Sequence, residues 1–229
     1  MNLPLARRRQ VWWPTWAGWG CLFLVAASAT ALWWFRAERF FSMTEREPAD
    51  VLVVESWIGF EGLAAAKEEF QAGGYKWVVS AGGLSDNPWD RVRWDLAREA
   101  GDEFGRLGIP RDRIIVASHQ DTESQRTFAT AAAAWRALAV AGVKPRGINV
   151  FTIGPHARRS RLIFAKVFQP EVPVGVVSWS APKYRHEPWW RSSERAEDLI
   201  KETAGWSYEV LLNSGRLSNS AAESSAANH

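Results

Sequence analysis

The sequence has a single cysteine, Cys21, which lies within an apolar run near the N-terminus. A lone cysteine excludes an intrachain disulfide and a metal site built on cysteine ligands. Histidine is also scarce, with four residues in 229. No G-x-G-x-x-G follows the first apolar strand, and the chain has no P-loop, no G-x-S-x-G and no H-E-x-x-H. The usual signatures of dinucleotide binding, NTP binding, serine hydrolysis and zinc proteolysis are therefore missing.

The excess positive charge of the chain is concentrated near its N-terminus. Of the 28 basic and 25 acidic residues, six arginines and three glutamates lie in residues 1–47, which leaves 22 of each sign in the rest. The net charge of +3 thus belongs to the N-terminal segment, and the remainder is formally neutral. A neutral domain without an aromatic and basic RNA-binding motif is not expected to bind nucleic acid.

Residues 11–35 contain no charged side chain, and this length suffices to cross a bilayer of ~30 Å. Tryptophans gather at both ends of the run, as in the interfacial belt of a helix that stays in the membrane. They are Trp12, Trp13, Trp16 and Trp19 on one side, and Trp33 and Trp34 on the other. The sequence predicts one transmembrane helix over residues 11–35, with the lipid bilayer as its partner and a basic tail over residues 1–10.

Two further questions concern this segment, cleavage and orientation. The small residues Ala27–Ala31 offer a signal-peptide cleavage site, but Trp33–Phe35 suit an interfacial anchor better than a mature N-terminus. We therefore expect an uncleaved, single-pass anchor. Three arginines, Arg7–Arg9, precede the span, and the positive-inside rule then places the N-terminus in the cytoplasm and the domain outside it.

From Asp50 onward short apolar strands alternate with amphipathic helices. The predicted strands are Asp50–Glu55, Lys76–Ser80, Arg113–Ala117, Ile148–Ile153 and Val172–Ser178. The predicted helices are Phe60–Ala72, Asp90–Leu107, Glu123–Ala141, Pro155–Phe168 and Ser193–Leu212, the third opened by a capping box over Thr122–Gln125. This alternation predicts an α/β fold, a Rossmann-like, three-layer parallel sheet of about five strands with helices on both faces. Residues 36–49 are then a linker, 50–213 the domain, and 214–229, rich in Ser, Asn and Ala, a disordered tail.

The most informative motif is Gly154-Pro155-His156-Ala157-Arg158-Arg159-Ser160, directly after the predicted strand Ile148–Ile153. Pro155 suits the first helical position, where its missing N–H costs nothing. An imidazole and two guanidiniums then fall in the first turns of a helix, where backbone N–H groups already favour anions. Cations oppose the helix dipole there, so they need a separate reason. A bound anion would supply it, whereas solvated arginines and a capping histidine are the alternative.

Further candidate residues follow the other strands. In a sheet of order 3-2-1-4-5, ligands bind beyond the carboxyl ends of the strands where the order reverses. Glu55-Ser56 after the first strand would then face Gly154–Arg159 after the fourth, with a glycine turn after the second strand alongside. The predicted catalytic residues are Glu55 and His156, and the predicted ligand-binding residues are Ser56, Gly82, Gly83, Arg126, Thr127, Arg158 and Arg159. No metal-ligand set is visible, and no cofactor can be named from the sequence.

Each candidate also has a structural interpretation. Glu55 is either a general base or half of an ion pair across the strand ends, because a carboxylate ending an apolar strand is costly unless paired. Arg126 binds an anion or pairs with Glu55 or Asp121. Arg158 and Arg159 point about 100° apart, so one of them faces the site. The remaining candidates are the loop histidines His119 and His186 and the tryptophans Trp57, Trp189 and Trp190. The tryptophans either stack on a sugar or anchor the last helix.

The order of short motifs from Asp50 to Phe168 resembles the YdcF/SanA/ElyC family of bacterial membrane-associated domains. The matching segments are Asp50–Val54, the Ser80–Gly83 turn, the step Gly108-Ile109-Pro110 before the third strand, and a His-x-x-Arg-like segment at His156. The chain departs from the family pattern at Glu55-Ser56-Trp57, where many members have glycine. It also has Arg126-Thr127-Phe128-Ala129-Thr130 in place of Asn-Thr-x-x-Asn. It is similar to a branch with a Trp-Trp-Arg-Ser-Ser-Glu segment, here Trp189–Glu194.

The resemblance implies a Rossmann-like domain on the bacterial inner (plasma) membrane, in a family linked to envelope integrity and cell-wall (peptidoglycan) biogenesis. Together with the residues, it predicts binding of a small anionic, phosphorylated cell-wall or lipid-carrier precursor. If the protein is an enzyme, phosphoester or pyrophosphate hydrolysis is the expected chemistry, with the arginines neutralising oxyanions. Two alternatives stay open: a non-enzymatic scaffold or regulator that contacts envelope-assembly proteins, and a cytoplasmic nucleotide- or S-adenosylmethionine-binding enzyme of opposite topology.

Overall fold

The computed structural model describes residues 13–84, 94–120, 122, 125–184 and 187–212. By its internal contacts the chain divides into two compact units, residues 1–37 and 38–229. The predicted basic tail (1–10) and the predicted disordered tail (214–229) lie outside the described residues.

The first helix, α1, runs from Trp16 to Phe41, and it is long and apolar enough to cross a membrane. Among the described residues it is the one helix that meets this test. Thr15 precedes it, and its hydroxyl accepts a hydrogen bond from Gly18 N at 3.2 Å, which satisfies one of the unpaired donors of the first turn. Residues 11 and 12 of the predicted span lie outside the described residues, and the helix continues six residues past Phe35.

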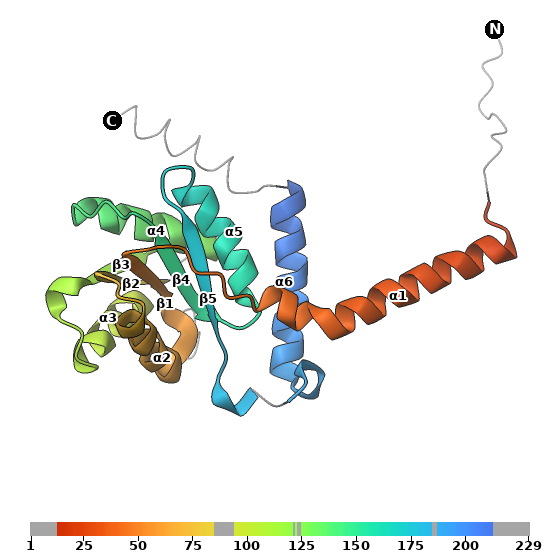
Figure 1. Cartoon of the computed structure of the whole chain (residues 1–229), viewed down its shortest axis with the longest axis horizontal. Coiled ribbons are helices and arrows are strands. Elements are labelled where there is room, and N and C mark those ends of the chain that lie inside the picture. Colours follow the sequence, from red (N-terminus) through yellow and green to blue (C-terminus); the bar gives the residue numbers. More distant parts are fainter. Residues whose placement is uncertain (1–12, 85–93, 121, 123–124, 185–186, 213–229) are drawn as a thin grey trace, which may run out of the picture. The chain divides into compact units, whose positions relative to one another are not determined.

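Five parallel strands form a single sheet in the order β3-β2-β1-β4-β5 (Figure 1). The strands are β1 Val51–Glu55, β2 Trp77–Gly83, β3 Ile114–His119, β4 Ile148–Ile153 and β5 Val174–Trp179. Both faces of the central strands are covered, and every residue of β1 is buried, which explains why these strands are apolar runs without alternation. The predicted parallel sheet is therefore confirmed, and its strand order is the one on which the site prediction was conditional.

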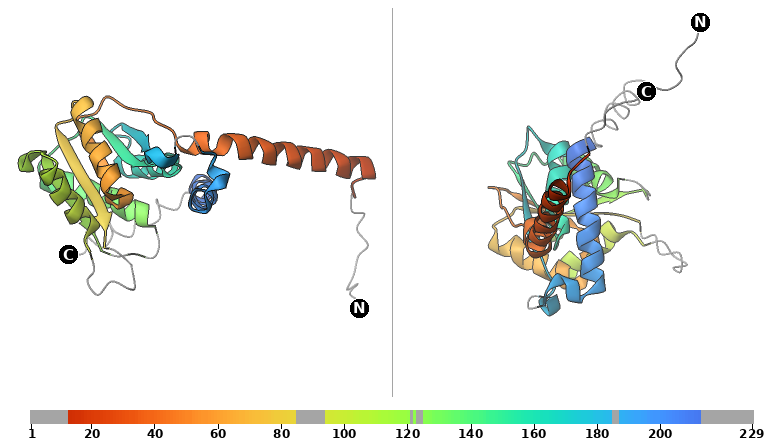
Figure 2. Two further views of the ribbon diagram at one scale, coloured as in Figure 1. Left: turned by 90° about the horizontal axis from the view of Figure 1, so that it is seen from below. Right: turned by 90° about the vertical axis from the view of Figure 1, so that its right-hand side faces the viewer.

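Helices cover both faces of the sheet, as predicted (Figures 1 and 2). Helices α2 (Gly59–Ala72) and α3 (Leu96–Arg106) pack on one face in a core that includes Leu52, Phe70 and Phe104. Helices α4 (Arg126–Val140) and α5 (His156–Phe168) pack on the other face, in a core that includes Val53 and Phe164. The last helix, α6 (Ser193–Leu212), contacts α5. Short 3-10 turns complete the structure at Ser56–Ile58, Arg111–Arg113, Pro182–Tyr184 and Trp189–Arg191.

The starts of three helices differ from the sequence prediction. Helix α3 begins at Leu96, because the Asp95 side chain caps it by accepting from Arg98 N at 3.1 Å, and the predicted start at Asp90 lies outside the described residues. The predicted capping box does not start α4, which begins at Arg126 after Gln125 in a left-handed conformation (φ 56°). Residues 123 and 124 of that box lie outside the described residues. Pro155 precedes α5 as its N-cap residue instead of occupying its first turn.

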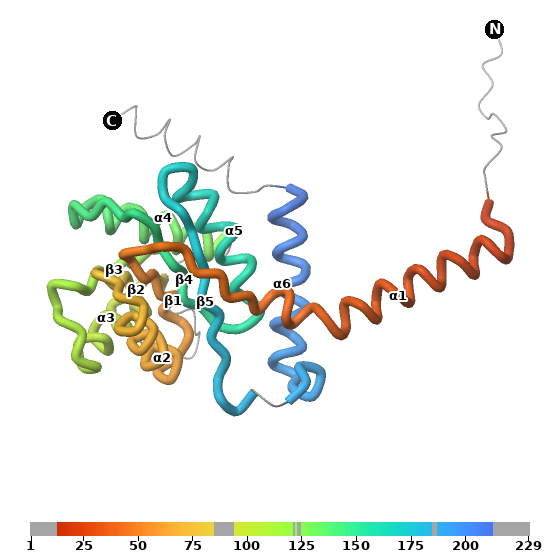
Figure 3. The backbone as a smooth tube through the Cα atoms, in the orientation of Figure 1, coloured from red at the N-terminus to blue at the C-terminus, as the bar shows by residue number. Residues whose placement is uncertain are grey.

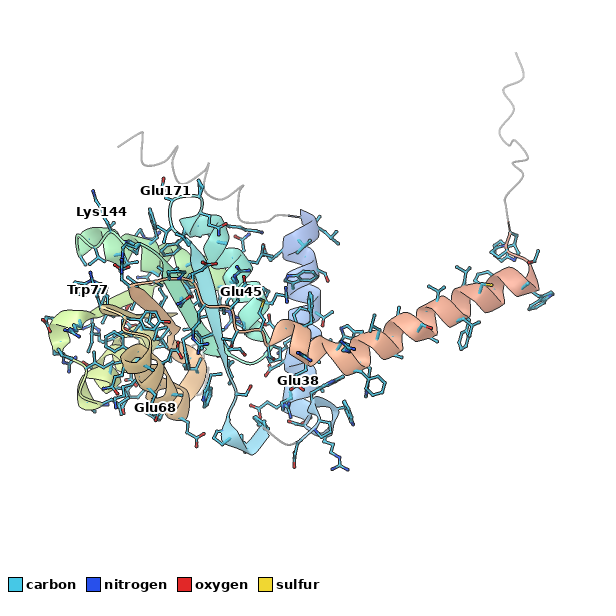
Figure 4. The ribbon with its side chains drawn as sticks, in the orientation of Figure 1. Glu38, Glu45, Glu68, Trp77, Lys144 and Glu171 are labelled. Carbon is cyan, nitrogen blue, oxygen red and sulfur yellow. The ribbon has the colours of Figure 1, made fainter. Side chains whose placement is uncertain are left out.

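Residues 42–50, here called the strap, connect α1 to β1 and bind along the sheet (Figure 3). Glu45 (labelled in Figure 4) pairs with Val176 of β5 through two backbone hydrogen bonds, of 2.8 and 2.7 Å. The buried Asn149 amide of β4 accepts from Glu47 N at 2.9 Å and donates to Glu47 O at 3.0 Å. A Cβ at Gly175 would lie 1.9 Å from Asn149 Oδ1, so the strap requires glycine there. The predicted linker is thus bound to the sheet over much of its length.

We expect Asn149→Leu to lower the free energy of unfolding by about 2–4 kcal/mol, because the leucine leaves Glu47 N and Glu47 O without their partner and removes one of the two hydrogen bonds of the Tyr75 hydroxyl. The measurement is thermal or urea unfolding of the full chain in detergent. Gln71→Leu, the same kind of change on the exposed side of α2, is the matched control and should stay within about 0.5 kcal/mol of wild type. Equal effects of the two substitutions would contradict the role of Asn149.

Candidate functional site

A cavity of about 500 Å³ lies at the carboxyl edge of the sheet, around the ends of β1, β2 and β3 and the first turns of α4 and α5. This edge includes the point where the strand order reverses between β1 and β4, the usual position of a ligand site in an open α/β sheet. Helix α6 closes one side. The lining comprises Glu55, Trp57, Gly82, Gly83, Leu84, Leu96, His119, Gln125, Arg126, Thr127, Thr130, His156, Arg159, Gly205, Tyr208 and Glu209.

Glu55 ends the central strand β1 and is almost completely buried, with 1% of its surface exposed. The Ser160 hydroxyl donates to its Oε2 at 2.8 Å, and His156 Nε2 lies 3.7 Å from its Oε1. Both partners come from the first turns of α5, which starts directly beyond the neighbouring strand β4. The parallel pairing of β1 with β4 therefore places beside Glu55 the hydrogen-bond donor and the cation that a buried carboxylate needs.

A second carboxylate, Glu202 of α6, holds the two cations of α5 in place. Its Oε1 lies 2.7 Å from His156 Nδ1, and Arg159 donates from Nε to Oε2 at 2.6 Å and from Nη2 to Oε1 at 2.9 Å. This bidentate pairing fixes the guanidinium plane. Arg159 Nη2 also lies 3.1 Å from His156 Nδ1. Since both nitrogens carry hydrogens when His156 is charged, they share Glu202 Oε1 as acceptor.

The four charges of this cluster stabilise one another. Burial disfavours the imidazolium, but the Glu55 carboxylate and the hydrogen bond to Glu202 outweigh burial and raise the pKa of His156 to about 9. Burial also opposes the charged form of each carboxyl group. The hydrogen bonds from His156 and Arg159 nevertheless lower the pKa of Glu202 to about 2, and His156 holds the pKa of Glu55 below its ordinary value. At neutral pH the cluster is therefore two anions and two cations. These ion pairs explain why α5 tolerates cations in its first turns.

The glycine turn at the end of β2 and the first turn of α4 form another wall of the cavity. Gly83 lies against the imidazole of His119, and a Cβ at Gly83 would come within 2.5 Å of that ring. His119 Nδ1 lies 2.7 Å from Gln120 O, a carbonyl that can only accept, so the proton on this ring sits on Nδ1 in the neutral form. Its Nε2 lies 3.1 Å from the hydroxyl of Thr130. The wall thus presents glycine backbone, a hydroxyl and an imidazole.

The structure brings most of the predicted site residues to one cavity. Those that line it are Glu55, Gly82, Gly83, Arg126, Thr127, His156 and Arg159. Ser56 lies behind this wall: it is buried, and a Cβ at Gly82 would lie 3.5 Å from its hydroxyl oxygen. Within the part of the chain that the structure describes, that hydroxyl has no hydrogen-bond partner. The functional roles of these residues remain predictions.

Arg158 is not in the cavity, so of the two adjacent arginines only Arg159 lines it. Arg158 Nε donates to Phe40 O at 2.6 Å, and its guanidinium lies 3.8 Å from the centre of the Phe40 ring. Trp57 lines the cavity and meets the His156 ring edge to face at 4.9 Å. Trp189 is buried outside it, which favours packing over sugar stacking. Asp121 and His186 lie outside the described residues.

Sequence reasoning missed Glu202 and Ser160. Glu202 follows the predicted site by more than 40 residues, and no local motif surrounds it. One signal in the sequence could have found Glu202: it lies three residues after Leu199 and therefore on the same side of the predicted last helix. The two are the buried residues of α6. An acidic residue on the apolar stripe of a helix requires a buried cation. Ser160 was within the quoted motif, one turn after His156, but its bond to Glu55 depends on the crossing of α5 over β1.

The described residues contain no group of three or more His, Cys, Asp or Glu side chains placed to hold a metal ion. Comparison with models of known protein families gives no match, and no characterised protein matches the chain at a significant level. The resemblance to the YdcF/SanA/ElyC family, drawn from the motifs of the sequence, therefore stays a prediction. What the cavity offers chemically is a charged imidazole, two arginines, the carboxylates of Glu55 and Glu209, hydroxyl groups and glycine backbone.

The raised pKa of His156 makes stability depend on pH in a defined direction. The unfolded imidazole titrates near 6.5 and the folded one near 9, so its contribution is complete below pH 6.5 and is lost as pH rises through 9. We expect stability to fall by on the order of 3 kcal/mol across this window in the full chain, measured as the unfolding midpoint against pH.

His156→Gln removes the titrating group, so its profile should be flatter between pH 6.5 and 9. His119→Gln, which removes an imidazole bonded to Gln120 and Thr130, is the matched control and should keep the wild-type slope. If His156→Gln retains the wild-type slope, the imidazole is not charged in the folded state.

Proposed function

We propose that the chain is a membrane-anchored α/β protein of the bacterial envelope whose cavity binds a small anionic ligand. The proposed ligand is a phosphorylated cell-wall or lipid-carrier precursor, and the proposed process is envelope biogenesis. The apolar helix α1 supports anchoring, because it is long enough to span a membrane. The family resemblance of the sequence supports the bacterial envelope as the setting. The arginines Arg7–Arg9 before the span support placing the domain outside the cytoplasm.

The observation that carries the proposal is the chemistry of the cavity wall. The cluster of Glu55, His156, Arg159 and Glu202 is balanced in charge, and Lys166 pairs with the carboxylate of Glu209 at 2.6 Å. The acidic side chains of the wall are therefore compensated. Arg126 lines the cavity, and the amino-terminal turns of α4 and α5 add positive potential there, which favours an anion. Gly82 and Gly83 let backbone approach such a ligand closely.

If the protein catalyses a reaction, His156 is better suited to donate a proton than Glu55 is to accept one. Both side chains line the cavity, but the imidazolium is charged at neutral pH, whereas the Glu55 carboxylate has 1% of its surface exposed and already accepts from Ser160. A phosphoester or pyrophosphate bond would need such a donor at its leaving oxygen and cations at its other oxygens. The proposed chemistry is therefore acid-assisted hydrolysis at phosphorus, with Arg126 and Arg159 on the oxyanions.

A second candidate function is a non-enzymatic scaffold in an envelope-assembly complex. One observation favours it, namely that the cluster of four charges satisfies itself without a ligand. In that case the cluster serves only to fasten α5 and α6 to the sheet. Exposed aromatic surface such as Trp57 and Trp190, each more than 40% exposed, would then contact the partner. Ligand binding distinguishes the two candidates.

The deciding experiment is a thermal-shift screen of the full chain in detergent, with phosphate, pyrophosphate, nucleotides, S-adenosylmethionine and undecaprenyl phosphate as probes. A ligand at ~100 times its dissociation constant stabilises the folded state by about 2.7 kcal/mol. We expect a phosphorylated probe to raise the unfolding midpoint of wild type, and Arg126→Ala to abolish the shift because the variant removes a cation of the cavity wall.

Arg136→Ala is the matched control, since Arg136 is exposed on the same helix, α4, and does not line the cavity. It should respond to the probe as wild type does. A response that survives Arg126→Ala would place the anion elsewhere, and a flat panel would favour the scaffold. A shift with S-adenosylmethionine alone would favour the cytoplasmic enzyme, which a topology reporter fused to the C-terminus tests independently.

A further inference from the structure

Helix α6 carries exposed apolar side chains along one side. Ile200 is 57% exposed, Tyr208 52% and Leu211 79%. With Ala204 they follow one another at intervals of four, four and three residues, which places all four along one side of an α-helix. Leu199 and Glu202, in contrast, are buried against the domain. We call the four exposed residues the outer stripe of α6. A water-soluble surface helix carries polar residues there.

Chain length keeps α6 close to the end of the proposed membrane span. Phe40 and Phe41 contact Trp206 in the middle of α6, with ring centres 5.3 and 6.0 Å apart, and Arg195 near its start pairs with Glu38 (labelled in Figure 4). Phe40 lies five positions after Phe35, the last residue of the uncharged run. A segment of this length reaches at most about 18 Å even when fully extended. If residues 11–35 cross the bilayer, Trp206 is therefore held near its surface.

The second half of α6 has the composition of a segment at a lipid surface. From Gly205 to Leu212 the one charged residue is Glu209, and Lys166 neutralises it at 2.6 Å. Trp206 and Tyr208 belong to the residue types enriched at membrane interfaces. The acidic residues of the helix lie mainly in its first half, as Glu194, Glu197 and Asp198. A lipid surface can thus cover the outer stripe without stripping water from an unpaired charge.

We propose that the outer stripe of α6 rests on the lipid surface of the membrane that α1 spans. The helix then makes a second contact with the membrane, at its interface, as the amphipathic helices of peripheral membrane proteins do. Tyr208 belongs to both the outer stripe and the cavity wall, so this contact puts the cavity beside the lipid headgroups. The inference rests on the proposed membrane anchoring, and its test is designed to separate the two.

The test uses the full chain with Cys21→Ser, single cysteines carrying the fluorophore NBD, and vesicles of phosphatidylcholine and phosphatidylglycerol with or without doxyl-labelled lipid. Leu211→Cys reports on the outer stripe, and Ile200→Cys repeats the measurement on the same stripe about three helical turns earlier. Leu24→Cys, within α1, reports on anchoring. Val140→Cys, 90% exposed at the end of α4, is the matched control for an aqueous position. All four side chains are exposed, so the labels do not disturb the core.

We expect lipid quenching at positions 211 and 200 to exceed that at position 140 at least twofold, and position 24 to be quenched as well. If position 24 is quenched but the quenching at positions 211 and 200 equals that at position 140, the surface contact is overturned and the anchoring stands. Absence of quenching at 24 would overturn the anchoring and the contact together. A second copy of the chain could cover the outer stripe instead. In that case the emission at position 211 is blue-shifted without lipid quenching, and unlabelled Leu211→Cys copies form a disulfide with each other. This result would overturn the lipid contact.

Discussion

The buried charge of Glu55 is the constraint on which the organisation of the site depends. A carboxylate with 1% exposure at the end of the central strand is costly unless cations and donors surround it. Ser160 and His156 fill this role from α5, and their placement requires α5 to begin directly beyond β4. The charged His156 and its neighbour Arg159 in turn require Glu202, which fastens α6 to α5. One acidic side chain thus determines the composition of two helices.

The hydrophobic pattern of the sequence was sufficient to predict the architecture, because local periodicity distinguishes buried strands from amphipathic helices. The run Val51–Val54 is apolar on both sides, and Ile148–Ile153 is apolar except for Asn149 and Thr152, which is typical of strands buried in a parallel sheet. The strand order on which the site prediction was conditional is the observed one, and it brings Glu55 and His156 together. Helix starts were less predictable: α4 begins after the left-handed residue Gln125, a conformation that the sequence of a polar loop does not specify.

The composition of the candidate site could be predicted only in part, because half of its contacts join distant segments. Glu55, His156 and the glycine turn follow strands directly, so topology alone places them at one edge. Glu202 reaches the site through the packing of α6 on α5, which no local pattern encodes. Arg158 shows the opposite case: it lies one residue from Arg159, and the rotation of the helix turns it to Phe40 instead. Contacts between side chains of different elements therefore limit what sequence alone can assign.

The strap also has a bearing on the order of events during synthesis. Its residues leave the ribosome before any strand of the sheet, yet Glu47 pairs with Asn149 and Glu45 with Val176, more than 100 residues later in the chain. The strap cannot bind until β4 and β5 exist, and contacts of such sequence separation form late. The segment that adjoins α1 is thus the first part of the domain to be made and among the last to become fixed. Until then the nascent domain is joined to α1 only through an unattached stretch of chain.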